Sequence, residues 1–391
     1  MLMPKNPAQV TRALCALLLI ACSAVAQASQ VIIPAPPQLA SSAYLLLDAS
    51  TGEVLVENNA DQQLPPASLT KMMTSYIVSS EIARGNLQED ELVDVSVKAW
   101  RMGGSKMFIR EGTRVSVKDL LRGVIIQSGN DASVALAEHV AGSEDAFVDV
   151  MNQQAALLGM NQTQYHNATG WPAEGHVTTA RDLSLLARAL INDYPDHYKL
   201  YSEKYFKYNG INQPNRNKLL FRDKSVDGIK TGHTDEAGFC LVSSAKKNGM
   251  RLIAVVMGTR SEAARAAESQ KLLTYGFRFF QTHKLYGSGE KLADSRVWAG
   301  KVDSVDIGIQ QDILLTIPRG AEKQLKASML IDEVIKAPLS VGQELGSLEV
   351  RLNDELLVQQ PLVALNGVEQ AGFFARIWDA IKLFFSQLFS A

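Results

Sequence analysis

A serine followed three positions later by a lysine is the first pattern in this sequence that could support acyl transfer. It occurs four times, beginning at Ser68, Ser243, Ser244 and Ser288. A serine hydroxyl attacks a carbonyl only when an adjacent base takes its proton, and residues three apart share a face on a helix but not on a strand. Ser68 alone opens a predicted helix, because apolar residues follow it at helical spacing. Its hydroxyl is therefore predicted to meet the amine of Lys71.

The Ser68–Lys71 pair also has a structural interpretation. Ser68 would then be an N-cap residue, whose hydroxyl satisfies a free N–H group of the first helical turn. For catalysis Lys71 must act as a base, and a lysine amine accepts a proton only when it is neutral. Its pKa would have to fall from about 10.4 by roughly 3 pH units, at a cost of about 4 kcal/mol. Burial and a second nearby cation are the means of lowering it.

Two further motifs favour the catalytic interpretation. Ser128-Gly129-Asn130 is the only Ser-x-Asn in the chain and falls in a turn between two predicted helices. Lys230-Thr231-Gly232 is the only Lys-Ser/Thr-Gly and lies just before a predicted pair of strands. Each motif alone is typical of a polar turn, and Tyr165-His166-Asn167 could imitate the middle one from a loop much nearer the third. All three in this order favour a single catalytic site.

The elements that must position these motifs follow from the hydrophobic pattern. Extended segments and a turn predict a β-hairpin near the start, and a second antiparallel pair of strands follows Lys230. Mostly helical patterns fill the region between them, and one sheet with helices packed around it is the economical architecture. The predicted strands are 44–48, 54–57, 239–244 and 251–257, and the predicted helices are 117–126, 132–140, 180–191 and 261–281.

The three motifs resemble the signature motifs of the penicillin-recognising serine enzymes: Ser68-Leu69-Thr70-Lys71, Ser128-Gly129-Asn130 and Lys230-Thr231-Gly232-His233-Thr234. Within that superfamily the chain is most similar to the low-molecular-mass penicillin-binding proteins that are serine-type D-alanyl-D-alanine carboxypeptidases. The resemblance covers essentially the whole chain. It implies an α+β fold with a serine β-lactamase/transpeptidase-like catalytic domain, in which helices flank an antiparallel sheet. A small all-β C-terminal domain and an amphipathic terminal helix would follow.

Composition shifts along the chain agree with this organisation. A glycine-rich stretch near residue 287 introduces short β-rich segments, and helical periodicity returns only near residue 370. The predicted parts are a signal peptide at 1–28, an extended lead-in at 29–41, a catalytic domain at 42–286, a β-rich domain at 287–368 and a membrane-anchor helix at 369–391.

The resemblance also implies a reaction. Ser68 would attack the carbonyl between the two terminal D-alanines of a peptidoglycan stem peptide, with Lys71 as the general base. Ser128 and Lys230 would relay a proton to the departing D-alanine, and water would release the acyl-enzyme. β-Lactams would be inhibitors, because they mimic the D-alanyl-D-alanine amide and trap Ser68.

Substrate binding is implied in the same way. Asn130 would orient the acyl peptide, while Lys230 and Thr231 would help to bind the terminal carboxylate. Backbone N–H groups of Ser68 and His233 would form the oxyanion hole. Arg216 and Arg265 are weaker candidates for the carboxylate. No cofactor is expected, and none of the six histidines has the spacing of a metal site.

The N-terminus predicts export. Lys5 and Arg12 precede an apolar stretch at 13–25, and Ala26-Gln27-Ala28 is a typical cleavage site. A lipoprotein signal ending at Cys22 is the alternative. Removal of the leader lowers the formal net charge from −2 to −4, which argues against nucleic acid as a partner. The expected location is the periplasmic face of the inner membrane.

The C-terminal segment 373–389 is strongly amphipathic. Its polar residues fall within an arc of roughly 140° on a helical projection, which only Leu383 interrupts. Aromatic and aliphatic side chains cover the opposite side. Such a helix suits insertion in the plane of a bilayer surface, so the inner-membrane surface is the expected partner. Docking on the protein's own core is the alternative.

A serine β-lactamase and a scaffold without catalysis are the alternative functions. A serine β-lactamase usually has one domain, and the comparable loop here has Glu174 but no Glu-x-x-Leu-Asn motif. A membrane-tethered scaffold without catalysis would not need Lys71 and Lys230 alongside Ser68. Cys240, the single cysteine outside the leader, lies in an apolar run and is expected to be a small buried hydrophobe rather than a reactive thiol.

Overall fold

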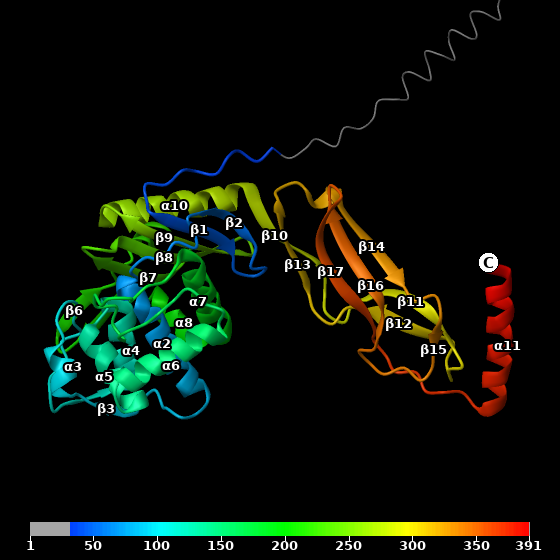
Figure 1. Ribbon diagram of the computed structural model, residues 1–391, viewed down its shortest axis with the longest axis horizontal. Helices are drawn as coiled ribbons and strands as arrows, with labels where there is room; N and C mark the ends of the chain where they lie inside the picture. Colours follow the sequence, from blue (N-terminus) through cyan, green and yellow to red (C-terminus); the bar gives the residue numbers. More distant parts are fainter. Residues whose placement is uncertain (1–31, 391) are drawn as a thin grey trace, which may run out of the picture. The chain divides into compact units, whose positions relative to one another are not determined.

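The computed structural model describes residues 32–390 (Figure 1). The predicted signal peptide lies outside these residues. The chain divides into two compact units, a larger one formed by Ala35–Asp294 with Asp306–Ile317 and a smaller one that includes Ser295–Val305 and the chain from Pro318 onward. The domain boundaries drawn from the sequence stay predictions. Of the predicted lead-in, residues 32–41 have no helix or strand.

A five-stranded antiparallel sheet forms the centre of the larger unit, in the order β2-β1-β9-β8-β7. The predicted hairpin is present as β1 (Ala43–Asp48) and β2 (Val54–Asn58). The predicted pair of strands is present as β8 (Gly238–Lys247) and β9 (Met250–Thr259). The Lys230 motif lies on the edge strand β7 (Val226–Thr234), which pairs along its length with β8.

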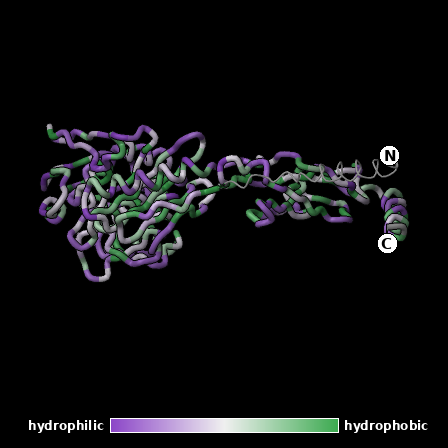
Figure 2. Tube along the Cα trace, turned by 90° about the horizontal axis from the view of Figure 1, so that it is seen from above, coloured by the Kyte–Doolittle hydropathy of each residue, from purple (hydrophilic) through white to green (hydrophobic). Residues whose placement is uncertain are grey.

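Helices cover both faces of this sheet (Figure 1). One face carries α10 (Glu262–Phe279), and the other faces a group of helices around the buried α2 (Lys71–Ala83). Figure 2 shows hydrophobic positions gathered inside this unit and hydrophilic ones along its outside. The other helices of the group are α3 (Val97–Arg101), α4 (Val117–Arg122), α5 (Asn130–Ala141), α6 (Glu144–Leu157), α7 (Ala180–Asp193) and α8 (Pro195–Tyr198). The short helix α9 (Leu219–Arg222) lies beside β7.

Burial along α2 sets the environment of the predicted site. Its first ten residues, from Lys71 to Ser80, are all buried, so no face of this stretch is open to water. A helix that is buried all round lies at the centre of a domain. A lysine at its first position is therefore enclosed by protein, which is the condition that lowers a lysine pKa. Cys240 is also buried, as expected, and its burial raises the thiol pKa to about 11.

The C-terminal region contains a six-stranded sheet in the order β14-β16-β17-β12-β11-β15, which confirms the predicted β-rich character. Neighbouring strands of the β14-β16-β17 meander are antiparallel, and the short edge strand β15 runs parallel to β11. The strands are β11 (Lys291–Trp298), β12 (Ser304–Gly308), β14 (Leu325–Ile331), β15 (Ile335–Lys336), β16 (Glu344–Leu352) and β17 (Glu355–Ala364). The short sheets elsewhere are β3 (Leu92–Asp94) with β4 (Arg114–Ser116), β5 (Tyr205–Tyr208) with β6 (Ile211–Pro214), and β10 (Phe280–Tyr286) with β13 (Ile313–Pro318).

The terminal helix α11 (Phe373–Ser390) has two different faces. Its aromatic and aliphatic side chains are exposed, for example Phe374 at 85% and Trp378 at 60%. Leu383, the apolar exception on the polar side, is buried, and the Asp379 carboxylate accepts a hydrogen bond from the backbone N–H of Ala299 (3.0 Å). The polar side thus contacts the protein while the apolar side remains uncovered. No helix among the described residues is long and apolar enough to cross a membrane.

Asp131 joins the Ser128 turn to the loop that follows α3. Its carboxylate accepts hydrogen bonds from the backbone N–H groups of Met107 and Phe108, both at 2.8 Å. It lies in the first turn of α5 and is fully buried. A carboxylate is tolerated inside a protein when such donors and a helix N-terminus surround it. The side chain therefore fixes the loop against the motif.

We expect Asp131→Asn to lower the free energy of unfolding by about 2–4 kcal/mol, because an amide cannot accept from the same set of N–H donors with both of its ends. Urea denaturation followed by circular dichroism measures this. Asp94→Asn changes an exposed carboxylate and should shift the unfolding free energy by less than about 0.5 kcal/mol. Coincident unfolding curves for wild type and the Asp131 variant would contradict the prediction.

Candidate active site

Ser68 and Lys71 lie where a short 3₁₀ turn, Ala67–Thr70, runs into α2. The Lys71 Nζ donates a hydrogen bond to the Ser68 Oγ over 3.0 Å. The cap residue of the turn is Pro66, not Ser68. The hydroxyl is therefore directed at the amine, as the helical spacing predicts.

Two other acceptors complete the surroundings of the Lys71 amine. Its Nζ donates to the side-chain oxygen of Asn130 (2.7 Å) and to the backbone carbonyl of Thr169. Lys71 is 1% exposed. Burial, followed by the positive charge of Arg216, lowers its pKa to about 7, against the opposing effect of Asp131. These are the two means that the chemistry of a lysine base requires.

A second lysine and serine pair faces the first. The Lys230 Nζ donates to the Ser128 Oγ (2.9 Å) and to the carbonyl of Thr231 (2.9 Å). Lys230 is 2% exposed, and burial together with the charges of Lys71, Arg216 and Arg265 holds its pKa well below the ordinary value. The structure thus brings Ser68, Lys71, Ser128, Asn130 and Lys230 together from three separate segments.

Close backbone packing holds β7 against the nucleophile. A Cβ at Gly232 would lie 3.0 Å from the carbonyl oxygen of Pro66 and 3.3 Å from the Cβ of Ala67. A glycine here lets the strand approach the turn that carries Ser68. Arg265, from α10, donates to the Gly232 carbonyl over 3.0 Å and so holds the strand at this point.

Two residues beside the chemistry adopt left-handed backbone conformations. Ala67 has φ of 47° and Ser128 has φ of 64°, which are unfavourable for residues with a Cβ. Such conformations persist only when surrounding contacts impose them, and they concentrate at functional sites. Here one directly precedes the nucleophile and the other carries the hydroxyl that meets Lys230.

The loop 166–176 contributes residues that sequence reasoning missed. Thr169 supplies the carbonyl for Lys71, and the Asn167 side-chain oxygen accepts from the backbone N–H groups of Thr169 (3.1 Å) and Gly170 (2.7 Å). His176 lies within hydrogen-bond distance of the Thr70 hydroxyl (2.9 Å), and burial lowers its pKa to about 4. From the sequence, Tyr165-His166-Asn167 is only a possible imitation of the middle motif. It belongs to the site as loop scaffolding.

Two cavities open beside the nucleophile. The first has a volume of about 380 Å³ and is lined by Ser68, Ser105, Ser128, Arg216, Thr231, Gly232, His233, Phe239, Glu262 and Arg265. It therefore contains both arginines that the sequence named as weaker candidates. The His233 side chain is exposed, and its ring packs on Phe239 with 3.9 Å between centroids.

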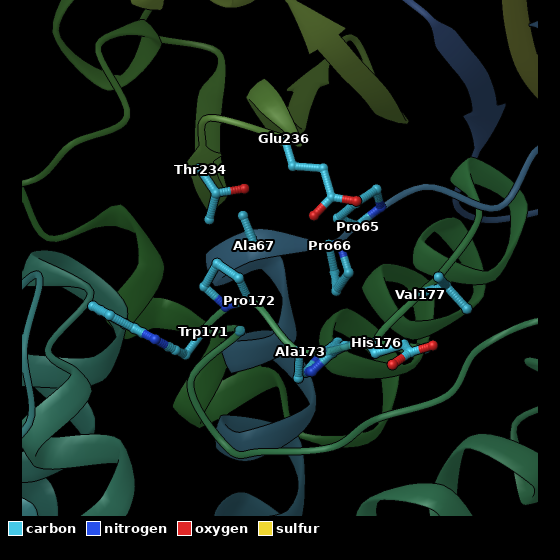
Figure 3. A pocket seen from close by; sticks show the side chains of 13 residues that line it. Pro65, Pro66, Ala67, Trp171, Pro172, Ala173, His176, Val177, Thr234 and Glu236 are labelled. Atoms are coloured by element: carbon cyan, nitrogen blue, oxygen red, sulfur yellow. The ribbon is translucent and has the colours of Figure 1, made fainter.

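The second cavity has a volume of about 400 Å³ and is lined by residues on the other side of the turn that carries Ser68 (Figure 3). Pro65, Pro66 and Ala67 come from that turn, and Trp171 and Pro172 come from the loop. Thr234 and Glu236, at the end of β7 and just beyond it, point into the space from above in Figure 3. Across the described residues, no group of His, Cys, Asp and Glu side chains could hold a metal ion.

Comparisons with known proteins agree with this fold. The family model for D-alanyl-D-alanine carboxypeptidase matches residues 30–261, and the model for the C-terminal domain of penicillin-binding protein 5 matches residues 280–370. D-alanyl-D-alanine carboxypeptidase DacA of Escherichia coli (strain K12) is 44% identical over 97% of this chain and 96% of its own length. DacC of the same strain is 44% identical over 91% of each chain.

Solved structures show the same relationship. Penicillin-binding protein 5 from Haemophilus influenzae has a TM-score of 0.81 and 41% identity, covering 86% of this chain and all of that one. Penicillin-binding protein D2 from Listeria monocytogenes in its ampicillin-bound form has a TM-score of 0.58 and 32% identity, covering 62% of this chain and all of that one. Fold and site together define a serine hydrolase of the penicillin-binding type. The chain belongs to the D-alanyl-D-alanine carboxypeptidase family, peptidase family S11.

We expect the Lys71 amine to titrate near pH 7, because burial and Arg216 both disfavour its proton. Carbon NMR of protein labelled at the lysine ε-carbon measures this, and Lys71→Gln identifies the signal by its disappearance. Arg216→Met should move the midpoint to higher pH, since it removes a neighbouring cation. Arg222→Met, which removes an exposed charge from α9, is the control. A Lys71 signal that titrates near pH 10 would refute the site's electrostatics.

Proposed function

We propose that this enzyme removes the C-terminal D-alanine from peptidoglycan pentapeptide stems through an acyl-enzyme on Ser68, and so limits the stems available for cross-linking. The observation that carries the proposal is the buried Lys71 amine, 3.0 Å from the Ser68 hydroxyl with a pKa near neutrality. A neutral amine at that distance can accept the hydroxyl proton as the new bond forms.

Acylation follows from the two lysine–serine pairs. The Ser68 Oγ attacks the carbonyl between the two D-alanines, and its proton passes to the neutral Lys71 Nζ. The carbonyl oxygen becomes an oxyanion that the backbone N–H groups of Ser68 and His233 stabilise. Ser128, hydrogen-bonded to Lys230, gives a proton to the amide nitrogen as the C–N bond breaks. The proton held by Lys71 then passes to the Ser128 Oγ, which leaves Lys71 neutral for the next step. D-Alanine leaves with its new amino group.

Deacylation restores the enzyme. A water molecule attacks the ester carbonyl, and Lys71 takes its proton and returns one to the departing Ser68 oxygen. The shortened peptide leaves with a new carboxylate. β-Lactams would enter the same path, because their strained amide acylates Ser68 without releasing a leaving group from the site. The ampicillin-bound form of the related penicillin-binding protein D2 from Listeria monocytogenes is consistent with this path.

The cavities suggest how the peptide lies. The terminal carboxylate would enter the cavity lined by Thr231, Arg216 and Arg265, where two guanidinium groups provide positive charge. Lys230 would add to that charge from its buried position. The acyl side of the stem would extend into the cavity of Figure 3, between the loop and the end of β7. The Asn130 side chain accepts a hydrogen bond from Lys71 and donates one to the Gly103 carbonyl (2.8 Å). It would orient the peptide between the two cavities.

We expect Ser68→Ala to abolish both D-alanine release from a pentapeptide and covalent labelling by penicillin, with a loss of at least about 10³-fold in rate. Mass spectrometry should find one acyl group on Ser68 of the wild type. Ser288→Ala is a matched control, since Ser288 begins another Ser-x-x-Lys sequence in an exposed turn. Continued D-alanine release by the Ser68 variant would refute the mechanism. Rapid nitrocefin hydrolysis without D-alanine release would favour a β-lactamase.

The terminal helix supports a place at a membrane surface. We propose that the enzyme is exported and bound to the periplasmic face of the inner membrane through α11. The exposed side of α11 carries Phe373, Phe374, Ile377, Trp378, Ile381, Phe384, Phe385 and Leu388. Water-exposed aromatics in such number are costly for a soluble surface, whereas an interfacial helix buries them among lipid headgroups and acyl chains.

Truncation after Gly372 should release the enzyme from membranes and leave D-alanine release unchanged, because the catalytic residues lie in the larger unit. Flotation of the protein with anionic phospholipid vesicles measures binding. Trp378→Glu in the full-length chain should also weaken flotation, since it places a charge on the exposed apolar side. Flotation of the truncated protein with vesicles would assign the helix another role.

A further inference from the structure

A carboxylate lies in the cavity that would receive the substrate's carboxylate. Glu262 is the only acidic residue in the lining of that cavity, which also contains Ser68, Arg216 and Arg265. It is the first residue of α10, and its side chain is 40% exposed, so it is open to the cavity. A site that binds an anion through arginines is weakened by a fixed anion among them. The placement of Glu262 therefore needs an explanation.

Glu262 is shared between two cations. One carboxylate oxygen accepts a hydrogen bond from the Lys218 Nζ at 2.9 Å, and the other lies 3.5 Å from an Nη of Arg265. Arg265 is nearly buried and directs its other terminal nitrogen to the Gly232 carbonyl. Lys218 thus draws Glu262 away from full engagement of Arg265, which leaves the guanidinium partly available. The arrangement reduces the positive potential of the cavity without removing its arginine.

The charge balance of the proposed reaction gives this reduction a use. One carboxylate enters with the peptide, and hydrolysis yields two: that of free D-alanine and the new terminus of the shortened peptide. A strongly cationic cavity would bind substrate well and also retain both products. We propose that Glu262 weakens carboxylate binding in this cavity and thereby speeds product release, trading affinity for turnover. This inference rests on the proposed carboxypeptidase function, whose site it deepens.

The size of the effect follows from elementary electrostatics. A unit charge a few ångströms from a bound carboxylate, at a partly exposed position, changes affinity by about three- to tenfold. Glu262→Gln removes the charge with almost no change in shape. It should lower KM for the pentapeptide and the inhibition constant for D-alanine by that factor, and it should lower kcat because the products leave more slowly. Acylation by a carboxylate-bearing penicillin should become faster by a similar factor.

Three further proteins make the test specific. Lys218→Met should act in the opposite direction, because it removes a cation and leaves Glu262 to Arg265 alone. Glu262→Gln combined with Lys218→Met restores the wild-type net charge and should return the constants toward wild type. Glu53→Gln changes an exposed acid in the turn before β2 and controls for net charge alone. The methyl ester of the same penicillin lacks the carboxylate, so its acylation rate should be the same for wild type and Glu262→Gln.

Each outcome decides between explanations. A higher KM for Glu262→Gln would overturn the proposal and make Glu262 a positioning residue that holds Arg265 in place. Unchanged kinetic and inhibition constants, with only a small loss of thermal stability, would also overturn the proposal. Glu262 would then only stabilise the first turn of α10 as an acidic residue. Equal acceleration of the free acid and the ester would also overturn it. Failure of the wild type to release D-alanine would refute the proposed function, while the two penicillins would still test the charge effect.

Discussion

The burial of Lys71 is the constraint on which the larger unit depends. An ammonium group in a protein interior costs several kcal/mol unless it gains partners or loses its proton, and Lys71 does both. Its three acceptors lie 3, 59 and 98 residues away along the chain. Only a helix buried on all sides, a turn at the start of α5 and the loop 166–176 can bring them to one point. The pKa near 7 is thus a product of the tertiary fold.

The same fold explains why Ala67 tolerates a left-handed backbone. A Cβ at Gly170 would lie 1.7 Å from the Ala67 carbonyl oxygen, so the loop presses directly on the turn before Ser68. Gly232 lets β7 press on that turn from another direction, near Pro66. These contacts hold Ala67, directly before the nucleophile, in a conformation that is unfavourable for a residue with a Cβ. This packing adds to the hydrogen bond between the Lys71 Nζ and the Ser68 Oγ in positioning the hydroxyl.

The sequence could predict the features that depend on a local pattern or a resemblance, but not those that depend on tertiary contacts. Helical spacing brought Ser68 to Lys71, and motif order added Ser128 and Lys230, because each depends on local pattern or on a recognisable resemblance. Thr169 was missed because it contributes a backbone carbonyl, which no residue type signals. In the fold, the strands and helices with clear periodicity were found. The strands β3 to β6, β10 to β12 and β15 were not predicted, because the pattern of a strand depends on the neighbours against which it packs.

Leu383 shows how a local pattern misleads when its partner is unknown. On a helical projection, Leu383 lies on the polar side of α11, which would be expected to face water. In the structure that side contacts the protein. Leu383 is buried there, and Asp379 accepts from the Ala299 N–H. Rolling α11 to cover its aromatic side would break that hydrogen bond and expose Leu383. The polar face of the helix is therefore used by its own chain, and its exposed apolar face is the part that our proposal assigns to a membrane surface.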